Sequence, residues 1–143
     1  MRLRASLASL ALVAGLVVVL APQPAQATET GLSATASSSW QTNNNVRAIA
    51  YANGRVFVGG EFTSVRPPGS ALGTGEVSRT YLAAFDSTTG SLITTWNPVL
   101  DASVWSLKAS ADGTSLYLGG DFTTINGVTR NRIAKLSTST GAV

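Results

Sequence analysis

The sequence predicts an all-β protein of short antiparallel strands, and three observations carry this prediction. From Trp40 onward, apolar runs of four to seven residues alternate with turn signals such as Asn-Gly and Asp-Gly, which is the pattern of β-hairpins. No stretch after residue 30 shows a sustained helical period with caps. A nine-residue phrase occurs twice, as "FVGGEFTSV" from Phe57 and as "YLGGDFTTI" from Tyr117. Repetition at this spacing indicates recurring structural units.

Residues 1–27 are expected to be a secretory signal peptide. Two arginines in "MRLR" precede an unbroken run of apolar and small residues, 5–20, and Ala25 and Ala27 then form an A-x-A cleavage pattern. A membrane anchor is the alternative, but the apolar run is shorter than the roughly 20 residues that span a bilayer. We therefore expect a secreted, extracellular protein that meets the membrane only through its export signal.

The rest of the chain divides into a leader and a series of strand-like runs. Residues 28–39 are small and polar and are expected to form a flexible leader. The later runs are rich in Val, Ile, Leu, Thr and aromatic residues, which favour strands. In chain order the runs are 46–51, 55–60, 80–86 and 91–96, followed by 103–109, 115–120 and 132–137.

These runs form two units, named here repeat 1 (40–95) and repeat 2 (96–143). Trp40 opens the first unit as Trp96 opens the second, and the same motifs follow in the same order. The recurring motif residues are Gly59, Gly60, Glu61 and Phe62 in repeat 1 and Gly119, Gly120, Asp121 and Phe122 in repeat 2. Four short antiparallel strands in each unit are the content of one β-propeller blade.

Because the motif occurs in both units, we interpret its residues as structural. The glycine pair is expected to let the backbone adopt a conformation closed to other residues, and the Phe and the boundary tryptophans are expected to pack within or between blades. An arginine follows each acid, so ion pairs are predicted between Glu61 and Arg79 and between Asp121 and Arg130. Such pairs are worth about 0–1 kcal/mol when exposed.

The stretch "GGDFTTINGVTRNRIAKLSTSTG", together with "TTWNP" at 94–98, resembles the delta-60 type of β-propeller repeat. Such repeats occur in secreted bacterial proteins and are distantly similar to kelch and galactose-oxidase propellers. The resemblance covers residues 40–143. It implies a propeller made of antiparallel four-stranded blades, and it says almost nothing about function.

Repeat 2 stops at "TGAV", partway into its expected fourth strand, so the fold is expected to be an incomplete propeller of about two blades. A closed propeller has about 4–8 blades. We therefore expect the chain to be an N-terminal fragment of a longer protein. The alternative is a genuine terminus at Val143, with two units that dimerise or swap.

The composition limits the chemistry that this chain can perform. The absence of His and Cys excludes Ser-His-Asp and Cys-His catalysis, and zinc or copper sites of the usual imidazole or thiolate kind. A glycosidase-like carboxylate pair stays conceivable, but the acids are repeat equivalents or turn residues. We predict no catalytic residue, no metal site and no cofactor. Without the two signal-peptide arginines, eight basic residues stand scattered against seven acidic ones, so no nucleic-acid partner is expected.

Three residues are candidates for ligand binding because they have no counterpart in the other repeat. Trp105 stands where repeat 1 has Arg47, and an exposed Trp could stack on a sugar ring, although core packing is the alternative. Arg66 and Glu76 flank the loop of "RPPGSALGTGEV" (66–77), which is nine residues longer than its counterpart in repeat 2. Loops on rigid scaffolds often carry function, and they also tolerate insertions.

The expected function is therefore extracellular binding or adhesion without catalysis, with carbohydrate or a cell-surface protein as partner. One alternative is that the chain forms the N-terminal part of a secreted carbohydrate-active enzyme whose active site lies beyond residue 143. The other is that it is a structural spacer of a surface protein.

Overall fold

The structure is a computed structural model that describes residues 39–143. The expected signal peptide, 1–27, and all of the expected leader except Ser39 lie outside the described residues. Within the described part, every regular element is a β-strand and all strand pairs are antiparallel. This confirms the all-β prediction. A search of the same residues finds no helix with the length and apolarity needed to cross a membrane.

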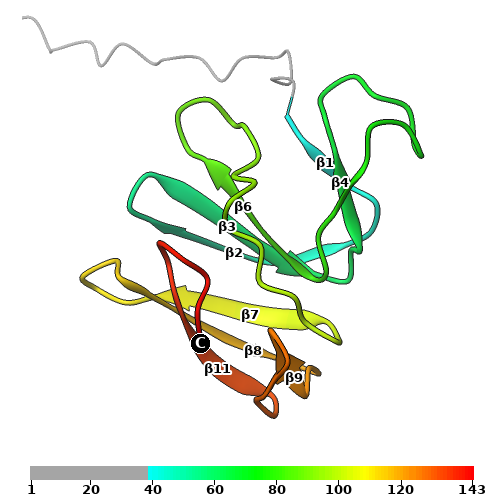
Figure 1. Cartoon of the computed structure of the whole chain (residues 1–143). Helices are drawn as coiled ribbons and strands as arrows, with labels where there is room; N and C mark the ends of the chain where they lie inside the picture. Colours follow the sequence, from blue (N-terminus) through cyan, green and yellow to red (C-terminus); the bar gives the residue numbers. More distant parts are fainter. Residues whose placement is uncertain (1–38) are drawn as a thin grey trace, which may run out of the picture. The chain divides into compact units, whose positions relative to one another are not determined.

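Repeat 1 forms a three-stranded sheet in the order β2 (Val46–Ala52), β3 (Arg55–Gly60) and β6 (Leu82–Asp86) (Figure 1). Asn53 and Gly54 connect β2 to β3 with φ angles of 48° and 70°. Two successive positive φ values are what a two-residue hairpin turn requires, and Asn-Gly supplies them at little steric cost. The turn therefore forms where the sequence predicts it.

Repeat 2 forms the equivalent sheet from β7 (Val104–Ala109), β8 (Ser115–Gly120) and β11 (Ile133–Ser137). Its register reproduces that of repeat 1, since the second glycine of each pair lies opposite the first residue of the inner strand, Val46 or Val104. The two main sheets therefore have the same strand register.

Each repeat also carries a small outer sheet or hairpin that the sequence pattern does not predict. In repeat 1, β4 lies between β1 and β5, and in repeat 2, β9 pairs with β10. The strands are β1 (Gln41–Thr42), β4 (Ser64–Arg66), β5 (Val77–Ser78), β9 (Thr124–Ile125) and β10 (Val128–Thr129). They are only two or three residues long, too short for an alternating pattern to be recognised.

The expected fourth strand, 91–96, does not form as a regular strand. It contributes a single bridge between Leu92 and Phe85, and the N–H of Trp96 then bonds to the carbonyl of Ile93 in a turn. The turn directs the Trp96 indole into the core, where it is fully buried. Burial of this large ring takes the place of further strand pairing in repeat 1, whose main sheet has three regular strands instead of four.

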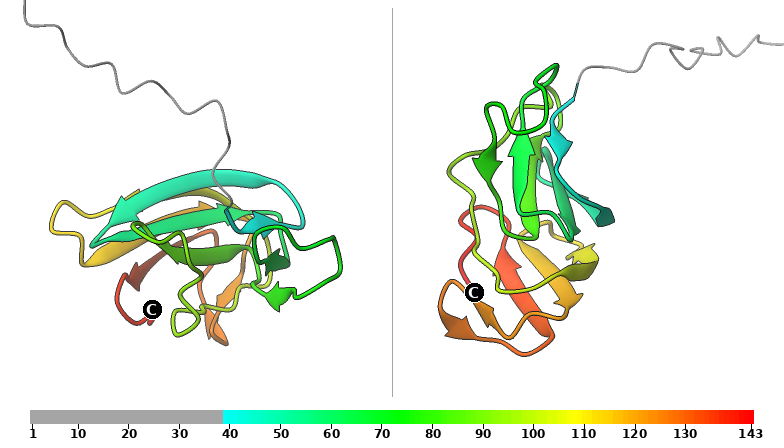
Figure 2. Two further views of the ribbon diagram at one scale, coloured as in Figure 1. Left: turned by 90° about the horizontal axis from the view of Figure 1, so that it is seen from above. Right: turned by 90° about the vertical axis from the view of Figure 1, so that its right-hand side faces the viewer.

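The two main sheets lie face to face and share one apolar core (Figure 2). Both repeats contribute to this core, which consists of the buried residues Ala52, Phe57, Leu82, Ala84, Trp96, Leu100, Val104, Leu116, Leu118, Phe122, Ile125, Ala134 and Leu136. At its centre, the rings of Phe57 and Trp96 meet edge to face with centroids 4.9 Å apart. Full burial of one such aliphatic or aromatic side chain is worth about 1.5–3 kcal/mol.

Hydrogen bonds at the margin of the core fix how the repeats sit on each other. Arg55 donates to the carbonyls of Thr138 and Ser139, and Asn53 Nδ2 donates to the carbonyl of Gly113 at 2.8 Å. Each such bond contributes only about 0.5–1.5 kcal/mol net. Apolar burial therefore dominates the energy of the contact, and the polar groups set its orientation.

Candidate functional site

A β-bulge in each main sheet positions one residue of the candidate site, Arg47 in repeat 1 and Trp105 in repeat 2. The pairing of β2 with β3 shifts between Val46 and Ala48, and the pairing of β7 with β8 shifts between Val104 and Ser106. Arg47 and Trp105 are the extra residues at these shifts. Bulges redirect a side chain out of the regular alternation, so the two side chains occupy equivalent positions at the same end of successive sheets.

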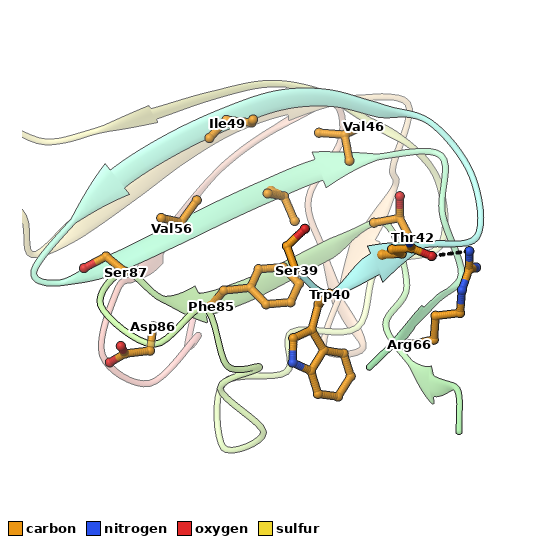
Figure 3. Close-up of a pocket in the computed structure, with 13 residues that line it drawn as sticks. Ser39, Trp40, Thr42, Val46, Ile49, Val56, Arg66, Phe85, Asp86 and Ser87 are labelled. Carbon is orange, nitrogen blue, oxygen red and sulfur yellow. Dashed lines mark hydrogen bonds between the residues drawn. The ribbon is translucent and has the colours of Figure 1, made fainter. Parts of the chain in front are cut away.

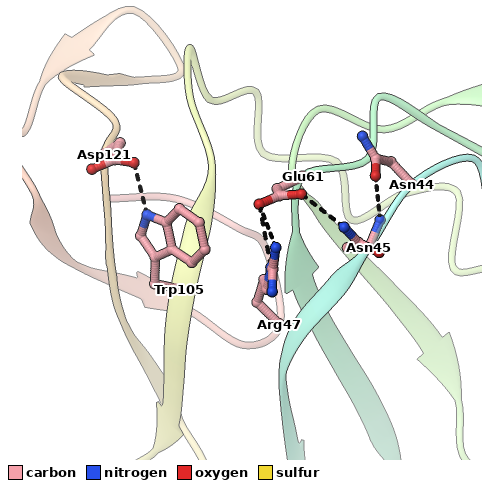
Figure 4. A network of polar contacts seen from close by, with 6 residues as sticks. All are labelled: Asn44, Asn45, Arg47, Glu61, Trp105 and Asp121. Carbon is pink, nitrogen blue, oxygen red and sulfur yellow. Dashed lines mark hydrogen bonds and ion pairs between the residues drawn. The ribbon is translucent and has the colours of Figure 1, made fainter.

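In repeat 1, Glu61 accepts hydrogen bonds from two neighbours (Figure 4). Arg47 donates from Nε at 3.2 Å and from Nη2 at 2.9 Å to Oε1, and Asn45 Nδ2 donates to Oε2 at 3.0 Å. The Asn45 hydrogen bond, followed by the Arg47 hydrogen bonds, lowers the pKa of Glu61. Glu61 is thus held ionised as an acceptor.

In repeat 2, Asp121 is the equivalent hydrogen-bond acceptor, but its donors are different residues. Trp105 Nε1 donates to Oδ2 at 2.8 Å, and Arg132 Nη1 donates to Oδ1 at 3.1 Å. The residue at the bulge therefore donates to the acid of its own repeat in both units, as guanidinium in one and as indole in the other.

The ion pairs predicted for these acids, Glu61 with Arg79 and Asp121 with Arg130, are wrong. The acids pair with Arg47 and Arg132. Arg79 donates to the carbonyls of Ser78 and Thr94 and is almost fully buried, and Arg130 donates to the carbonyl of Thr129. Sequence spacing favours these two arginines, but each directly follows a short strand, β5 or β10, and donates to backbone carbonyls there instead of to the acid.

The two networks meet at the boundary between the repeats. The guanidinium carbon of Arg47 lies 5.2 Å from the centre of the Trp105 ring, within the range of a cation–π interaction. Trp105 keeps 45% of its surface exposed. Its ring is therefore held by Asp121 at the N–H edge and by Arg47 over one face, while much of it stays accessible to a ligand.

Arg66 and Glu76 lie in a separate part of repeat 1. Arg66 donates to Gln41, joining β4 to β1, and Glu76 accepts from the Ser64 hydroxyl and from the N–H of Gly73 at 2.9 Å. The Ser64 hydrogen bond is the main cause of the lowered pKa of Glu76. Among the described residues, no hydrogen bond or ion pair joins Arg66 or Glu76 to Trp105. Glu76 thus braces the 67–76 loop, and Arg66 ties the strand before the loop to β1.

The expectation that the glycine pairs adopt a backbone conformation closed to other residues is wrong. Gly59, Gly60, Gly119 and Gly120 do not have the positive φ angles that favour glycine. The second glycine of each pair is required by close approach of the backbone, because a Cβ on Gly60 would lie 2.0 Å from the carbonyl oxygen of Asn45, and one on Gly120 would lie 2.2 Å from that of Ser103. The following residues, Phe62 and Phe122, are fully buried.

The two boundary tryptophans lie in different surroundings. Trp96 is buried between the repeats, and its Nε1 donates to the carbonyl of Ser137 at 3.1 Å. Trp40 is only half-buried, 6.4 Å from the ring of Phe85. It lies in a pocket of about 730 Å³ on the outer face of repeat 1, lined further by Val46, Ile49, Val56 and Val58 (Figure 3).

The acids of the described residues act as hydrogen-bond acceptors in turns and bulges. Asp101 accepts from the Thr123 hydroxyl and from the N–H groups of Thr123 and Thr124, and these bonds, that of the hydroxyl first, lower its pKa. Asp86 and Asp112 likewise cap turns, and hydrogen bonds lower the pKa of both. No group of three or more potential metal-ligating side chains occurs within 39–143.

Sequence reasoning missed Asn45, Arg47 and Arg132 as members of the site. Asn45 and Arg132 give no signal in the sequence. Arg47 gives one, since aligning the repeats sets it opposite Trp105. The two residues differ in type, but each can donate an N–H to the repeat-equivalent acid, Glu61 or Asp121.

The fold defines the class of the protein, an all-β protein of repeated antiparallel sheets, and a match to a β-propeller family agrees with it. A family model described as a "Domain of unknown function (DUF5122) beta-propeller" matches residues 111–142, which include β8 to β11 of repeat 2. Over that stretch the chain is similar to this family. No curated protein matches the chain, and no solved structure does either.

Proposed function

We propose that the chain is a secreted propeller-repeat module of the delta-60 type that binds neutral carbohydrate, without catalysis, on the surface around Trp105. One observation carries this proposal: an indole that is 45% exposed and yet held in place by a hydrogen bond to Asp121 and by the guanidinium of Arg47. A fixed, amphipathic ring presents an apolar face beside polar groups, with little side-chain entropy left to lose on binding.

The groups around the ring suit the hydroxyls of a sugar. Asp121 lies on one side of Trp105, and Arg47, Glu61 and Asn45 lie on the other (Figure 4). Arg132 donates a hydrogen bond to Asp121. Carboxylates accept hydrogen bonds, and guanidinium and amide groups donate them. Two acids and two arginines balance in charge, so the surface favours a neutral ligand over a strongly charged one.

The electrostatics of the site favour binding over hydrolysis. A glycosidase needs a carboxylic acid whose pKa is raised, so that it can protonate the leaving group. The hydrogen bonds of Asn45 and Arg47 lower the pKa of Glu61 instead. The carboxylate is therefore suited to accept hydrogen bonds from hydroxyls, not to donate a proton to a glycosidic oxygen.

The test is calorimetric titration of the full chain with soluble xylo-, cello- and chito-oligosaccharides. We expect at least one of these probes to bind, Trp105→Phe to retain part of the affinity, and Trp105→Ala to lose about tenfold or more. Tyr51→Ala is the matched control, because Tyr51 is another exposed aromatic residue that lies outside the Arg47–Trp105 network. Equal binding by the Trp105→Ala variant, or no binding of any probe, would reject the proposal.

A further inference from the structure

The packing of repeat 1 on repeat 2 supplies a template for a further contact. In that contact, Val104 and Leu107 of repeat 2 lie over Gly59 of repeat 1. A Cβ on Gly59 would come within 2.6 Å of Val104 Cγ1 and 3.3 Å of Leu107 Cδ1. Alongside, Phe57 of repeat 1 meets Trp96 edge to face. The contact thus consists of aliphatic knobs from one unit over a glycine of the other, next to an aromatic pair.

Val104 and Leu107 form what is here called the knob side of this contact. Equivalent residues are exposed to solvent on the outer face of repeat 1. Val46 and Ile49 hold the positions of Val104 and Leu107 in the register of the two sheets. Val46 is 40% exposed and Ile49 is 66% exposed. Trp40, which corresponds to Trp96, lies in the same pocket (Figure 3).

Gly59 and Phe57 form what is here called the socket side of the contact. Equivalent residues are also present on the outer face of repeat 2. Gly119 holds the position of Gly59 and lies at a hollow of about 220 Å³, lined in part by Tyr117 and Ile133. Tyr117 corresponds to Phe57 and Ile133 to Leu82. Phe57 and Leu82 are fully buried in the existing contact, whereas Tyr117 is 44% exposed and Ile133 is 72% exposed.

We propose that the outer face of repeat 2 binds the outer face of repeat 1 in a second copy of this chain. Val46 and Ile49 of one copy lie over Gly119 of the next, and Tyr117 lies against Trp40, as Phe57 lies against Trp96 within the chain. The two faces are different surfaces of one molecule, so the contact is head-to-tail. Head-to-tail contacts generate closed rings or open filaments.

Two lysines make this contact weaker than its template. Lys108 and Lys135 flank Tyr117 at the positions where Ala50 and Ala84 flank Phe57. Their aliphatic stems can lie along the apolar partner face, with each ammonium group kept at the rim in water. Association is therefore expected to be reversible and dependent on protein concentration.

Sedimentation velocity of the full chain over a range of concentrations tests the proposal. Ile49→Glu blocks the knob side and Ile133→Glu blocks the socket side, and both residues are so exposed that folding is preserved. Each variant alone should weaken self-association about tenfold or more, the effect of losing the burial of one branched aliphatic side chain. An equimolar mixture of the two variants should form a dimer, because each retains the face that the other lacks.

Leu72→Glu is the matched control, since Leu72 is equally exposed but lies in the 67–76 loop. This variant should associate like the unmodified chain. The double variant Lys108→Ala, Lys135→Ala restores the alanines of the template and should associate about tenfold more tightly. Three outcomes would overturn the proposal: an unmodified chain that stays monomeric at every concentration, association that survives both Glu substitutions, or loss in only one of them, which indicates a contact between identical faces.

Discussion

The guanidinium of Arg47 lies over the ring of Trp105, 5.2 Å from its centre, and the two residues occupy equivalent bulges in successive repeats. Arg47 also pairs with Glu61, and Trp105 with Asp121. A chain of polar contacts therefore runs from one repeat to the next at the exposed end of the inner strands. The core holds the sheets together, and this chain of contacts connects their rims.

The first prediction concerns this rim contact. In a double-mutant cycle of Arg47→Gln and Trp105→Leu, the two changes should be coupled by about 0.5–1 kcal/mol, the size of an exposed cation–π interaction. The free energy of unfolding in urea measures the coupling. Changes that add within about 0.3 kcal/mol would show that the contact has no energetic role.

The second prediction separates the glycines by what a methyl group would meet. Gly60→Ala places a Cβ against a backbone oxygen, which cannot move without breaking the bulge, and should destabilise the fold by more than about 2 kcal/mol. Gly119→Ala places its Cβ 2.7 Å from Ser106 Oγ, a side chain that can rotate away, and should cost less than about 1 kcal/mol. Thermal unfolding of the two variants measures the difference. Equal losses would contradict this account.

The third prediction compares the two boundary tryptophans. Trp96→Ala removes a fully buried ring, its edge-to-face contact with Phe57 and its hydrogen bond to Ser137, and should cost about 3–5 kcal/mol. Trp40→Ala removes a half-buried ring and should cost clearly less. Urea unfolding curves decide between this ranking and equal importance for the repeat-equivalent residues.

The fourth prediction is a dependence of stability on pH that arises from Asp101. Hydrogen bonds, that of the Thr123 hydroxyl first, lower the pKa of Asp101 in the folded chain, while in the unfolded chain its value is about 3.9. Its contribution is therefore complete above the unfolded pKa and is lost as the pH falls through the folded pKa. Asp101→Asn should be less stable than the unmodified chain at pH 7, and this gap should shrink below about pH 4.

Repeat 1 supplies a reciprocal control for Asp101. Asn43 Oδ1 accepts the N–H groups of Thr63 and Ser64, just as Asp101 accepts those of its own repeat. Asn43→Asp should therefore add a pH-dependent contribution where none exists. A gap between Asp101→Asn and the unmodified chain that stays constant down to pH 2 would contradict the prediction.

The fold was largely predictable because strand-forming residues and turn residues alternate clearly. Asn53-Gly54 locates one hairpin, and the repeated Gly-Gly phrase alone aligns the two sheets. The prediction of a fourth strand at 91–96 is wrong, because the β-branched residues of this run favour a strand locally. Its actual course is set by the burial of Trp96, a tertiary effect that overrides local preference.

The candidate site was predictable only in part. Trp105 stands out in the sequence because it breaks the repeat, but its partners do not. Arg132 has a φ of 68°, and it reaches Asp121 from that unusual backbone conformation. The bulges at Arg47 and Trp105 and the positive φ angle of Arg132 depend on how the strands pair. No pattern of residue types in this sequence predicts them. The sequence therefore favours Arg79 and Arg130 as partners of the acids, whereas the fold supplies Arg47 and Arg132.

The loop between β4 and β5 has a practical consequence. Ser64 and Val65 pair with Ser78 and Val77 in the same register in which Thr124 and Ile125 pair with Thr129 and Val128. Residues 66–76 close the first hairpin, and Asn126-Gly127 alone closes the second. The same strand pairing thus tolerates connections of very different length. This loop is a ready site for grafting a foreign peptide, an epitope or a fluorophore tag, since the scaffold beneath it does not depend on how much chain it carries.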